Sequence, residues 1–260
     1  RLQDVELRYI VKGRVLRDKR DPQAIADALV RVRKTYKRAL DQLVGDAGAD
    51  VLDDVFPFHP ALIDVLVDVS NLMQRERSAL RLLYEVLAAN GDMPLDTLLP
   101  VGRVFEHVFP PAGVDAARKA ETLQKIHHEW YEVLAPRVDA YVRLKTDQND
   151  PVSDERAQTL RQALKTVLLG LVSPRLAGRG NERLTVERLV KLNFADANGS
   201  RMSNKLGRLA TDLTDFQVLL APELQITGDG EQAVISYALG QASLGEVLRR
   251  ARDKVQNKPA

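Results

Sequence analysis

The chain of 260 residues contains no cysteine, and aromatic residues make up only 5% of it. The absence of cysteine excludes a disulfide framework and thiolate zinc sites, and it fits a reducing cytosol. No apolar run approaches the roughly 20 residues that a membrane-spanning helix needs, so we expect a cytoplasmic protein without a membrane partner. An excess of one charge is also lacking, because 38 basic and 36 acidic residues give a net charge of +2. Contact with a nucleic acid would therefore need a local basic patch.

The motifs of an independent enzyme are missing as well. The sequence has no Gly-x-x-x-x-Gly-Lys-Ser/Thr loop to hold nucleotide phosphates and no serine in a Gly-x-Ser-x-Gly elbow. His127-His128-Glu129 resembles a metal motif superficially, but adjacent histidines on a helix point about 100° apart, so we expect no metal site. Gly178-Arg179-Gly180 lacks the lysine of a phosphate loop and is interpreted as a plain loop. Because the chain starts at Arg1 in mid-pattern, we expect it to be a fragment of a longer protein.

Apolar residues recur at steps of three and four along most of the chain, which predicts a mainly helical protein. Asp21-Pro22 is a typical helix start and opens a predicted helix over 22–45. Its basic surface, Arg31 to Arg38, is interpreted as an ordinary solvated face, and Gly45 to Asp54 is predicted to be a small acidic loop. Further helices are predicted from Pro60, over 75–89, within 95–109, from Val114 with a kink at Pro136, around 160–171, over 185–193, around 202–216, and after a capping box at Ser243.

The only clear β signal lies near the C-terminal end. Leu224 to Thr227 and Ala233 to Leu239 flank Gly228-Asp229-Gly230, and their alternation predicts a hairpin with a glycine turn. Two helices followed by a hairpin are typical of a winged helix. The polar stretch from Lys145 to Ser153 is a candidate linker. We therefore expect a helical unit over residues 1–92, a helical connector over 93–150 and a winged-helix-like unit over 151–260.

Three arginines at the start of the third predicted helix form a candidate anion site. Arg77 and Arg81 are four residues apart and share a helix face, and Arg75 lies just before them. Like charges at this spacing repel by a few tenths of a kcal/mol and oppose the helix dipole. An anion facing them would offset both penalties. The alternative is a solvated face in which Glu76 and Glu85 are the partners.

A second candidate site lies on the helix before the hairpin. Arg201, Lys205 and Arg208 recur at steps of four and three, so they share one face that could enter a major groove or lie on phosphates. Asp229 and Glu231 in the predicted turn do not favour DNA contact by the wing. A winged helix that binds protein therefore stays an equal alternative.

The first arginine site lies in a segment with a family resemblance. Gln74 to Leu83 has the sequence Gln-Arg-Glu-Arg-Ser-Ala-Leu-Arg-Leu-Leu. It resembles Gly-Asp-Ala-Arg-Arg-Ala-Leu-Asp-Leu-Leu in the lids of the origin-recognition branch of AAA+ ATPases. The resemblance places the sensor-2 arginine, whose fork suits phosphate oxygens, at Arg77, with Arg75 in reserve and Arg81 beside it. It also implies that ATP and magnesium are held mainly by an upstream core of the same polypeptide, and not by this fragment alone.

A further resemblance covers roughly residues 1–250. The chain resembles the large bacterial ATPases of phage-defence islands, the PglY and BrxC-like proteins of phage growth limitation and bacteriophage exclusion (BREX). Members often continue Leu-Asn with His-Gly, where this chain has Phe194-Ala195, so no role of that histidine is carried over. The segments that carry the resemblance are Phe56-Pro57-Phe58-His59-Pro60-Ala61-Leu62, Leu72 to Leu83, Leu99-Pro100-Val101-Gly102, Lys165-Thr166-Val167-Leu168-Leu169 and Leu184 to Asn193.

Together the resemblances imply a mainly α fold: an AAA+ lid-like helical bundle, a helical connector and a winged-helix-like domain with one β-hairpin. The implied function is a non-catalytic piece of an ATP-driven phage-resistance protein that couples nucleotide state to DNA or partner-protein binding. The expected partners are the upstream ATPase core, other phage-defence proteins, DNA and further copies of the chain. The alternative is a helical adaptor for protein or DNA with no nucleotide coupling.

Overall fold

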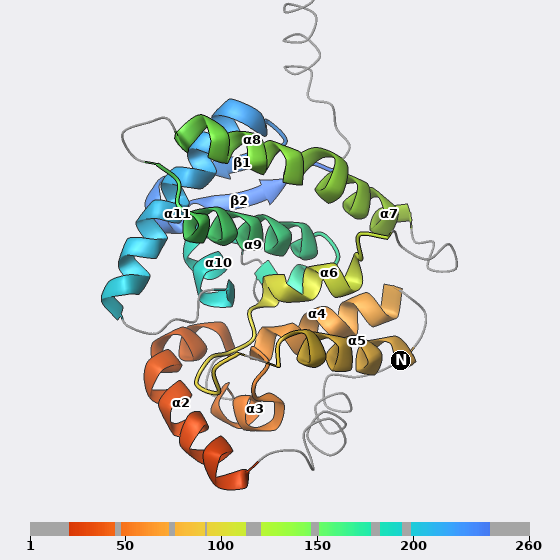
Figure 1. Ribbon diagram of the computed structural model, residues 1–260, viewed down its shortest axis with the longest axis vertical. Coiled ribbons are helices and arrows are strands. Elements are labelled where there is room, and N and C mark those ends of the chain that lie inside the picture. The colour runs from red at the N-terminus through yellow and green to blue at the C-terminus, as the bar shows by residue number, and fades with distance from the viewer. Residues whose placement is uncertain are drawn as a thin grey trace, which may run out of the picture.

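The computed structural model describes most of the chain as helices that cover one small sheet (Figure 1). The described residues are 21–44, 48–72, 76–91, 93–112, 121–146, 151–177, 183–193 and 199–239; within them 35–44, 48–50, 70, 76–80 and 199–205 contribute their backbone alone. The helices are α2 (Pro22–Val44), α3 (Gly48–Val55), α4 (Pro60–Leu72), α5 (Glu76–Ala89), α6 (Phe105–Val108), α7 (Glu121–His128), α8 (Ala135–Thr146), α9 (Asp154–Gly170), α10 (Val186–Asn193) and α11 (Gly199–Leu220). The 3₁₀ turns are η3 (Val101–Val104), η6 (Pro174–Ala177) and η7 (Gly230–Gln232), the π-helical turn is η5 (Glu129–Leu134), and the strands are β1 (Leu224–Thr227) and β2 (Val234–Tyr237). The mainly helical class with one hairpin is confirmed.

Helix α2 begins where its capping signal predicts. The carboxylate of Asp21 accepts a hydrogen bond of 2.9 Å from the backbone N–H of Gln23, which satisfies one of the free donors at a helix start. Ala28 and Val32 are fully buried on its inner face. On the opposite surface Arg31, Arg33 and Lys34 are exposed, as expected for a solvated basic face.

The predicted loop over Gly45 to Asp54 is wrong, because Gly48–Val55 forms α3. Glycine and aspartate have low helix propensity, so local preference does not favour this helix. Leu52 and Val55 lie three residues apart and are fully buried. Their burial against neighbouring elements outweighs the weak propensity.

The Phe-Pro-Phe-His-Pro segment joins α3 to α4 and pairs with a distant loop. The Phe56–Pro57 peptide bond is cis. The N–H of Leu99 donates to the Pro57 carbonyl at 2.8 Å, and the N–H of His59 donates to the Leu99 carbonyl at 3.3 Å. These bonds make a short parallel bridge between Phe58 and Leu99. The helix predicted within 95–109 is therefore shorter than expected and occupies Val101–Val108, as η3 followed by α6.

Helices α7 and α8 form one rod that is interrupted by the π-helical turn η5 (Figure 1). The N–H of Ala135 bonds to the carbonyl of Trp130, five residues earlier. Pro136 follows directly; it has no N–H, and its ring conflicts with the carbonyl four residues before it. The predicted disturbance at Pro136 thus takes the form of a π turn just before the proline. The predicted start at Val114 lies outside the described residues.

The C-terminal elements assemble around α9, which lies between α8 and α10 (Figure 1). Strands β1 and β2 form the predicted hairpin, and they pair antiparallel with Leu224 opposite Tyr237. Gly228 and Gly230 take φ values of +90° and +64° in the turn, a backbone region that favours glycine. The predicted final helix after Ser243 lies outside the described residues.

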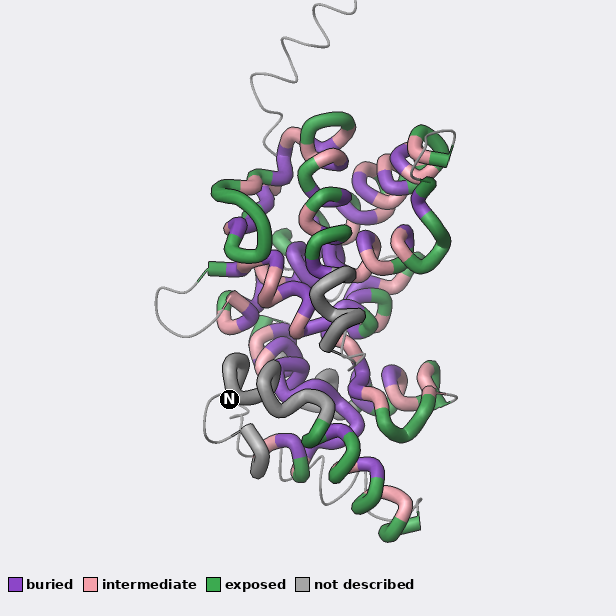
Figure 2. The backbone as a smooth tube through the Cα atoms, turned by 90° about the vertical axis from the view of Figure 1, so that its left-hand side faces the viewer, coloured by how far each residue is buried: buried purple, intermediate pink, exposed green. Residues whose placement is uncertain are grey.

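Most described elements share one hydrophobic core. A single cluster of buried side chains includes residues from Val55 to Tyr237 and from α4 through β2. The buried tube in Figure 2 follows this cluster through the body of the molecule. All three predicted segments, 1–92, 93–150 and 151–260, contribute to it, and their division into domains stays a prediction. A second cluster lies under α2 and consists of Ala28, Val32, Leu52, Phe56 and Leu98.

Candidate functional site

The first candidate site, Arg75, Arg77 and Arg81, is called the arginine turn. Arg77 and Arg81 lie on the first two turns of α5. Arg75 is outside the described residues, and the side chain of Arg77 is not described although its backbone lies in α5. The side chain of Arg81 is 73% exposed, and its Nε donates to Glu85 Oε1 at 2.7 Å. This carboxylate raises the pKa of Arg81. Exposed pairs of this kind contribute little to stability because solvent screens them, so the contact leaves Arg81 able to exchange Glu85 for another anion.

Titratable side chains lie next to one another from Glu85 on α5, through α6, to Lys165 on α9. His107 on α6 lies near both Glu85 and Glu106; burial lowers its pKa, while the two carboxylates act in the opposite direction. Glu106 in turn forms an ion pair with Lys165 of α9. The ammonium of Lys165 is 5.0 Å from the centre of the Trp130 ring, a favourable cation–π distance. Lys165 is not among the site residues predicted from the sequence, although a lysine inside an apolar helical run was the available signal.

Segments that carry the family resemblance meet at one buried point. The side-chain oxygen of Asn193 accepts from the backbone N–H of Gly102 at 2.9 Å and from the Thr166 hydroxyl at 3.0 Å. The Asn193 amide donates to the Leu189 carbonyl at 3.0 Å. A Cβ atom on Gly102 would lie 2.8 Å from both this Asn193 oxygen and the Gln162 carbonyl oxygen. Only glycine therefore allows η3 to approach α9 and α10 this closely.

His59 connects the same region to α4. Its Nδ1 accepts from the Ala61 N–H at 3.2 Å, and the ring also forms a hydrogen bond with the backbone of Lys191 in α10. Burial lowers the pKa of His59 to about 4, and the nearby cation of Arg188 acts in the same direction. The imidazole is therefore neutral at pH 7 and acts as a cap on α4 and a link to α10.

The basic face predicted on the helix before the hairpin lies in the N-terminal half of α11. Arg208 is exposed, and the side chains of Arg201 and Lys205 are not described. Continuing the same steps of three and four leads to Asp212 and Asp215. Asp212 accepts from Tyr141 at 2.9 Å and Arg156 at 2.7 Å, and Asp215 accepts from Lys145 at 2.6 Å. The C-terminal half of this line is thus covered by α8 and α9, whereas Arg208, the described basic residue of the line, is exposed.

The hairpin is fixed to the α7–α8 rod by buried polar contacts. The Tyr237 hydroxyl donates to Glu129 Oε1 at 2.5 Å, and burial raises the pKa of Tyr237. Arg137 donates to Glu223 at 2.7 Å. His127, by contrast, contacts the Pro110 carbonyl at 3.0 Å. The residues of the superficial metal motif therefore face different partners.

A comparison of the sequence with known families decides the relationship of the chain. A family model described as the BREX System ATPase PglY protein 2nd domain matches residues 8–230. The chain belongs to this family. The predicted resemblance to PglY-like phage-defence ATPases is thereby confirmed. No solved structure matches the chain, and the lid, sensor-2 and winged-helix assignments stay predictions.

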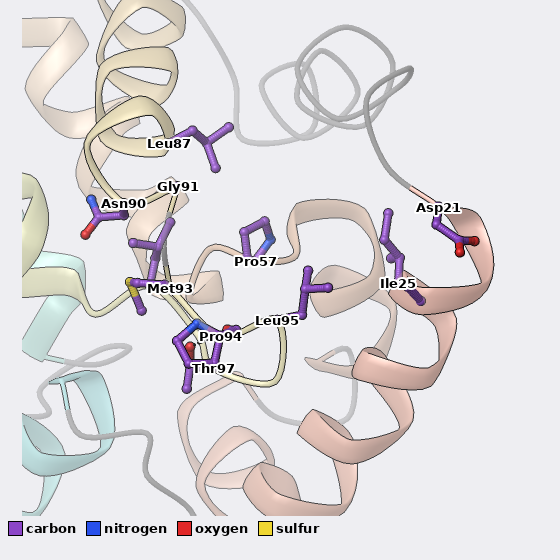
Figure 3. Close-up of a pocket in the computed structure, with 12 residues that line it drawn as sticks. Asp21, Ile25, Pro57, Leu87, Asn90, Gly91, Met93, Pro94, Leu95 and Thr97 are labelled. Atoms are coloured by element: carbon purple, nitrogen blue, oxygen red, sulfur yellow. Dashed lines mark hydrogen bonds between the residues drawn. The ribbon is translucent and has the colours of Figure 1, made fainter.

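Among the described residues of the chain, a pocket of about 280 Å³ lies near the start of α2. Figure 3 shows Asp21 just before α2, Ile25 of α2, Leu87 near the end of α5 and Leu95 of the following loop around it. The pocket residue Leu87 lies ten residues after Arg77 on the same helix, which corresponds to about 15 Å. The pocket and the arginine turn are therefore separate sites.

Neither a metal cluster nor a membrane-spanning helix is found among the described residues. No group of three or more histidine, aspartate or glutamate side chains in them is arranged to hold a metal ion. None of the described helices combines the length and apolar character needed to cross a membrane. Arg75 to Arg81 and Arg201 to Arg208 remain the two candidate sites, on α5 and α11.

Proposed function

We propose that the PglY second domain transmits the nucleotide state of its parent ATPase to a winged-helix-like unit that binds DNA. The observation that carries this proposal is the shared hydrophobic core, in which α5 and the elements from α9 to β2 belong to one cluster. A helix that moves with the nucleotide would displace α11 with it, because close-packed interiors transmit displacement rather than absorb it. The domain supplies positioning, and the chemistry belongs to the parent.

The arginine turn supports the nucleotide part of the proposal. Arg77 is the proposed sensor, with Arg75 in reserve, and Arg81 follows one turn later on α5. The inner face of α5 is anchored by Leu82, Leu83 and Val86, which are almost completely buried. A guanidinium in this place would contact phosphates of ATP and magnesium held by the upstream core.

The order of the C-terminal elements supports the winged-helix part. Thr185 forms an isolated antiparallel bridge with Val234, so a third short strand segment lies beside β2. The order is α9, the Thr185 bridge, α10, α11, β1 and β2. In a winged helix the last helix before the hairpin is the recognition helix, which assigns that role to α11 and its residues Arg201, Lys205 and Arg208.

Polar contacts between the two parts support their movement as one body. Arg175 of η6 donates to Asp64 at 3.1 Å and to Asp68 at 2.6 Å, both on α4. The Ser173 hydroxyl donates to Asp68 at 2.7 Å. A guanidinium fork shared between two carboxylates gives directional contacts in addition to apolar packing. The α4–α5 pair is thereby held to the segment that follows α9.

The test uses the full-length parent ATPase with single alanine variants. Arg77→Ala is expected to lower ATP hydrolysis by at least about tenfold, because a charge-stabilising contact to the phosphates is lost. It should also abolish the difference in DNA affinity between the ATP-bound and ADP-bound protein. Arg143→Ala, a charge removal at an exposed position of α8, is the matched control and should change neither quantity. Normal ATP hydrolysis in Arg77→Ala would refute the assignment of Arg77 as the phosphate sensor. If Arg75→Ala loses hydrolysis instead, the sensor is Arg75.

One observation favours the second candidate function, an adaptor without nucleotide coupling. Arg81 is engaged by Glu85, as the solvated-face alternative predicts. In that case α5 carries no phosphate contact, and binding of DNA or protein by the domain is the same with and without nucleotide. Equal DNA affinity of the parent in ATP, ADP and nucleotide-free buffers would support the adaptor over the coupled reading.

A further inference from the structure

Exposed basic residues gather on three elements that share α10 as a neighbour. α2, η3 and α11 all contact α10. Arg31 and Lys34 of α2, Arg103 of η3 and Arg208 of α11 are exposed. Figure 1 shows α2 and α11 on the same side of the molecule, with α10 close to both. Residues that are far apart in the sequence thus bring positive charge to one region.

Helix α2 carries more positive than negative side chains. It carries five basic residues against Asp27 and Asp41. Among the described contacts, Arg33 pairs with Asp53 of α3, and no ion pair is found for Arg31 or Lys34. The carboxylate of Asp27 instead accepts from the side chain of Gln23 at 3.0 Å. Arg31 and Lys34 are three residues apart and lie on neighbouring positions of the helix surface.

Elsewhere the described charges are largely matched. Arg137, Lys145, Arg156, Lys165 and Arg175 are all paired with carboxylates in or near the core. By contrast, no ion pair is found among the described contacts for the exposed Arg31, Lys34, Arg103 and Arg208, so unpaired positive charge lies on three elements that contact α10. Such a local surplus is the electrostatic feature that a nearly neutral protein needs to bind a polyanion.

We propose that Arg31, Lys34 and Arg103 extend the DNA contact of α11 into a wider surface that binds the phosphate backbone of duplex DNA. The inference rests on the proposed DNA-binding role of α11, and it names the chemistry of the additional contact. The side chains are long cations at exposed positions of α2 and η3. They suit phosphates rather than base edges, so they add affinity without sequence preference.

The experiment measures the salt dependence of DNA binding by the full-length parent with a fluorescein-labelled duplex of random sequence. Each lost phosphate contact lowers the slope of log affinity against log salt by about 0.9. The double variant Arg31→Ala/Lys34→Ala is expected to weaken binding and to reduce the slope by about 1.8. Arg103→Ala is expected to reduce it by about 0.9. The losses should be equal on duplexes of different sequence.

The matched control is the double variant Lys125→Ala/Arg143→Ala, which removes the same charge from exposed positions of α7 and α8. Its slope should equal that of the unmodified protein, and all variants are checked for unchanged circular dichroism and melting temperature. An unchanged slope in the α2 variant, or an equal reduction in the control, overturns the inference. If Arg208→Ala still weakens binding in that case, the proposed role of α11 survives. If the unmodified protein does not bind the duplex at low salt, both proposals fail together.

A stronger effect of the α2 variant on a single strand or on an unrelated acidic protein than on the duplex would also overturn the assignment. The first result would place the partner among single-stranded nucleic acids and the second among acidic proteins. Neither class is expected, because the exposed cations Arg31, Lys34, Arg103 and Arg208 lie on three different elements, and a duplex presents phosphates to several elements at once.

Discussion

The side-chain oxygen of Asn193 accepts a hydrogen bond of 2.9 Å from the backbone N–H of Gly102, which lies 91 residues earlier. The hydroxyl of Thr166 donates to the same oxygen at 3.0 Å. One buried amide therefore holds η3, α9 and α10 together. Because buried polar groups are costly when they lose their partners, this point is the most informative place for mutations that test the fold.

Gly102→Ala is expected to destabilise the domain by about 1–3 kcal/mol, the usual cost of overpacking a core. The new Cβ would lie 2.8 Å from a backbone carbonyl oxygen in α9 as well as from Asn193, and backbone cannot rotate away as a side chain can. Denaturant unfolding followed by circular dichroism measures the change. The control is Gly207→Ala on α11, where a Cβ meets no atom within 4 Å. That variant should gain about 0.5–1 kcal/mol, and equal behaviour of the two would contradict the packing argument.

Asn193→Ala should lower the free energy of unfolding by about 1–3 kcal/mol, since it leaves the buried Gly102 N–H without its acceptor. Thr166→Val is expected to cost less. The valine keeps the shape of threonine and removes a donor that also reaches the Gln162 carbonyl at 2.9 Å. Comparing the two variants by chemical denaturation separates loss of an acceptor from loss of a donor. A larger effect of Thr166→Val would show that the hydroxyl, and not the amide, organises the contact.

His59 is expected to make stability depend on pH. Its folded pKa of about 4 lies below the ordinary value of 6.5, so folding favours the neutral ring. This contribution is fully present above pH 6.5 and is lost as the pH falls toward 4, at a total on the order of 3 kcal/mol. His59→Asn keeps an acceptor for the Ala61 N–H and should show a smaller fall in unfolding free energy between pH 7 and 4.

The matched control for this titration is His128→Asn, at an exposed position of α7. It should retain the pH dependence of the unmodified chain. Carboxylates also titrate in this range, so the quantity to compare is the difference between each variant and the unmodified protein, measured by urea unfolding at several pH values. Identical curves for His59→Asn and His128→Asn would rule out the buried imidazole as the cause.

Asp212→Ala is expected to cost about 3 kcal/mol or more, because it removes the carboxylate from a nearly buried pair with Arg156. The two side chains are 4% and 13% exposed, and Tyr141 donates to the same carboxylate. Asp139→Ala breaks the more exposed pair with Arg161 and should cost less than about 1 kcal/mol. Thermal unfolding of both variants is the measurement. Similar losses in the two would mean that the contact of Asp212 is no stronger than a surface pair.

Periodicity and capping predicted the helices that bury a strong apolar stripe. α2, α9 and α11 follow their predicted spacing, and the hairpin was marked by alternation and by two glycines. α3 was missed because its stability comes from the burial of Leu52 and Val55 against other elements. Tertiary packing of that kind leaves no local signature in a short acidic segment.

The long-range part of the site could not be predicted from spacing. Glycine and asparagine are both common in turns, and nothing in the sequence shows that the Asn193 side chain accepts a hydrogen bond from the backbone N–H of Gly102. The local part was accessible: Glu85 was named as the alternative partner of Arg81, and the structure contains that pair. The phosphate role of Arg77 depends on a ligand and stays a prediction.

The π turn η5 determines the rotational phase between α7 and α8. It accommodates one residue more per turn than an α-helix does, and each α-helical residue advances the chain by about 100°. Because of this offset, Ile126 before the turn and Val138 after it both face the same core. If the same segment were a regular α-helix throughout, Ile126 and Val138 would lie about 120° apart around the helix axis, and one of the two apolar stripes would turn away from the core. The π turn therefore absorbs one residue more than a continuous α-helix could hold while both helices keep their contact with the core.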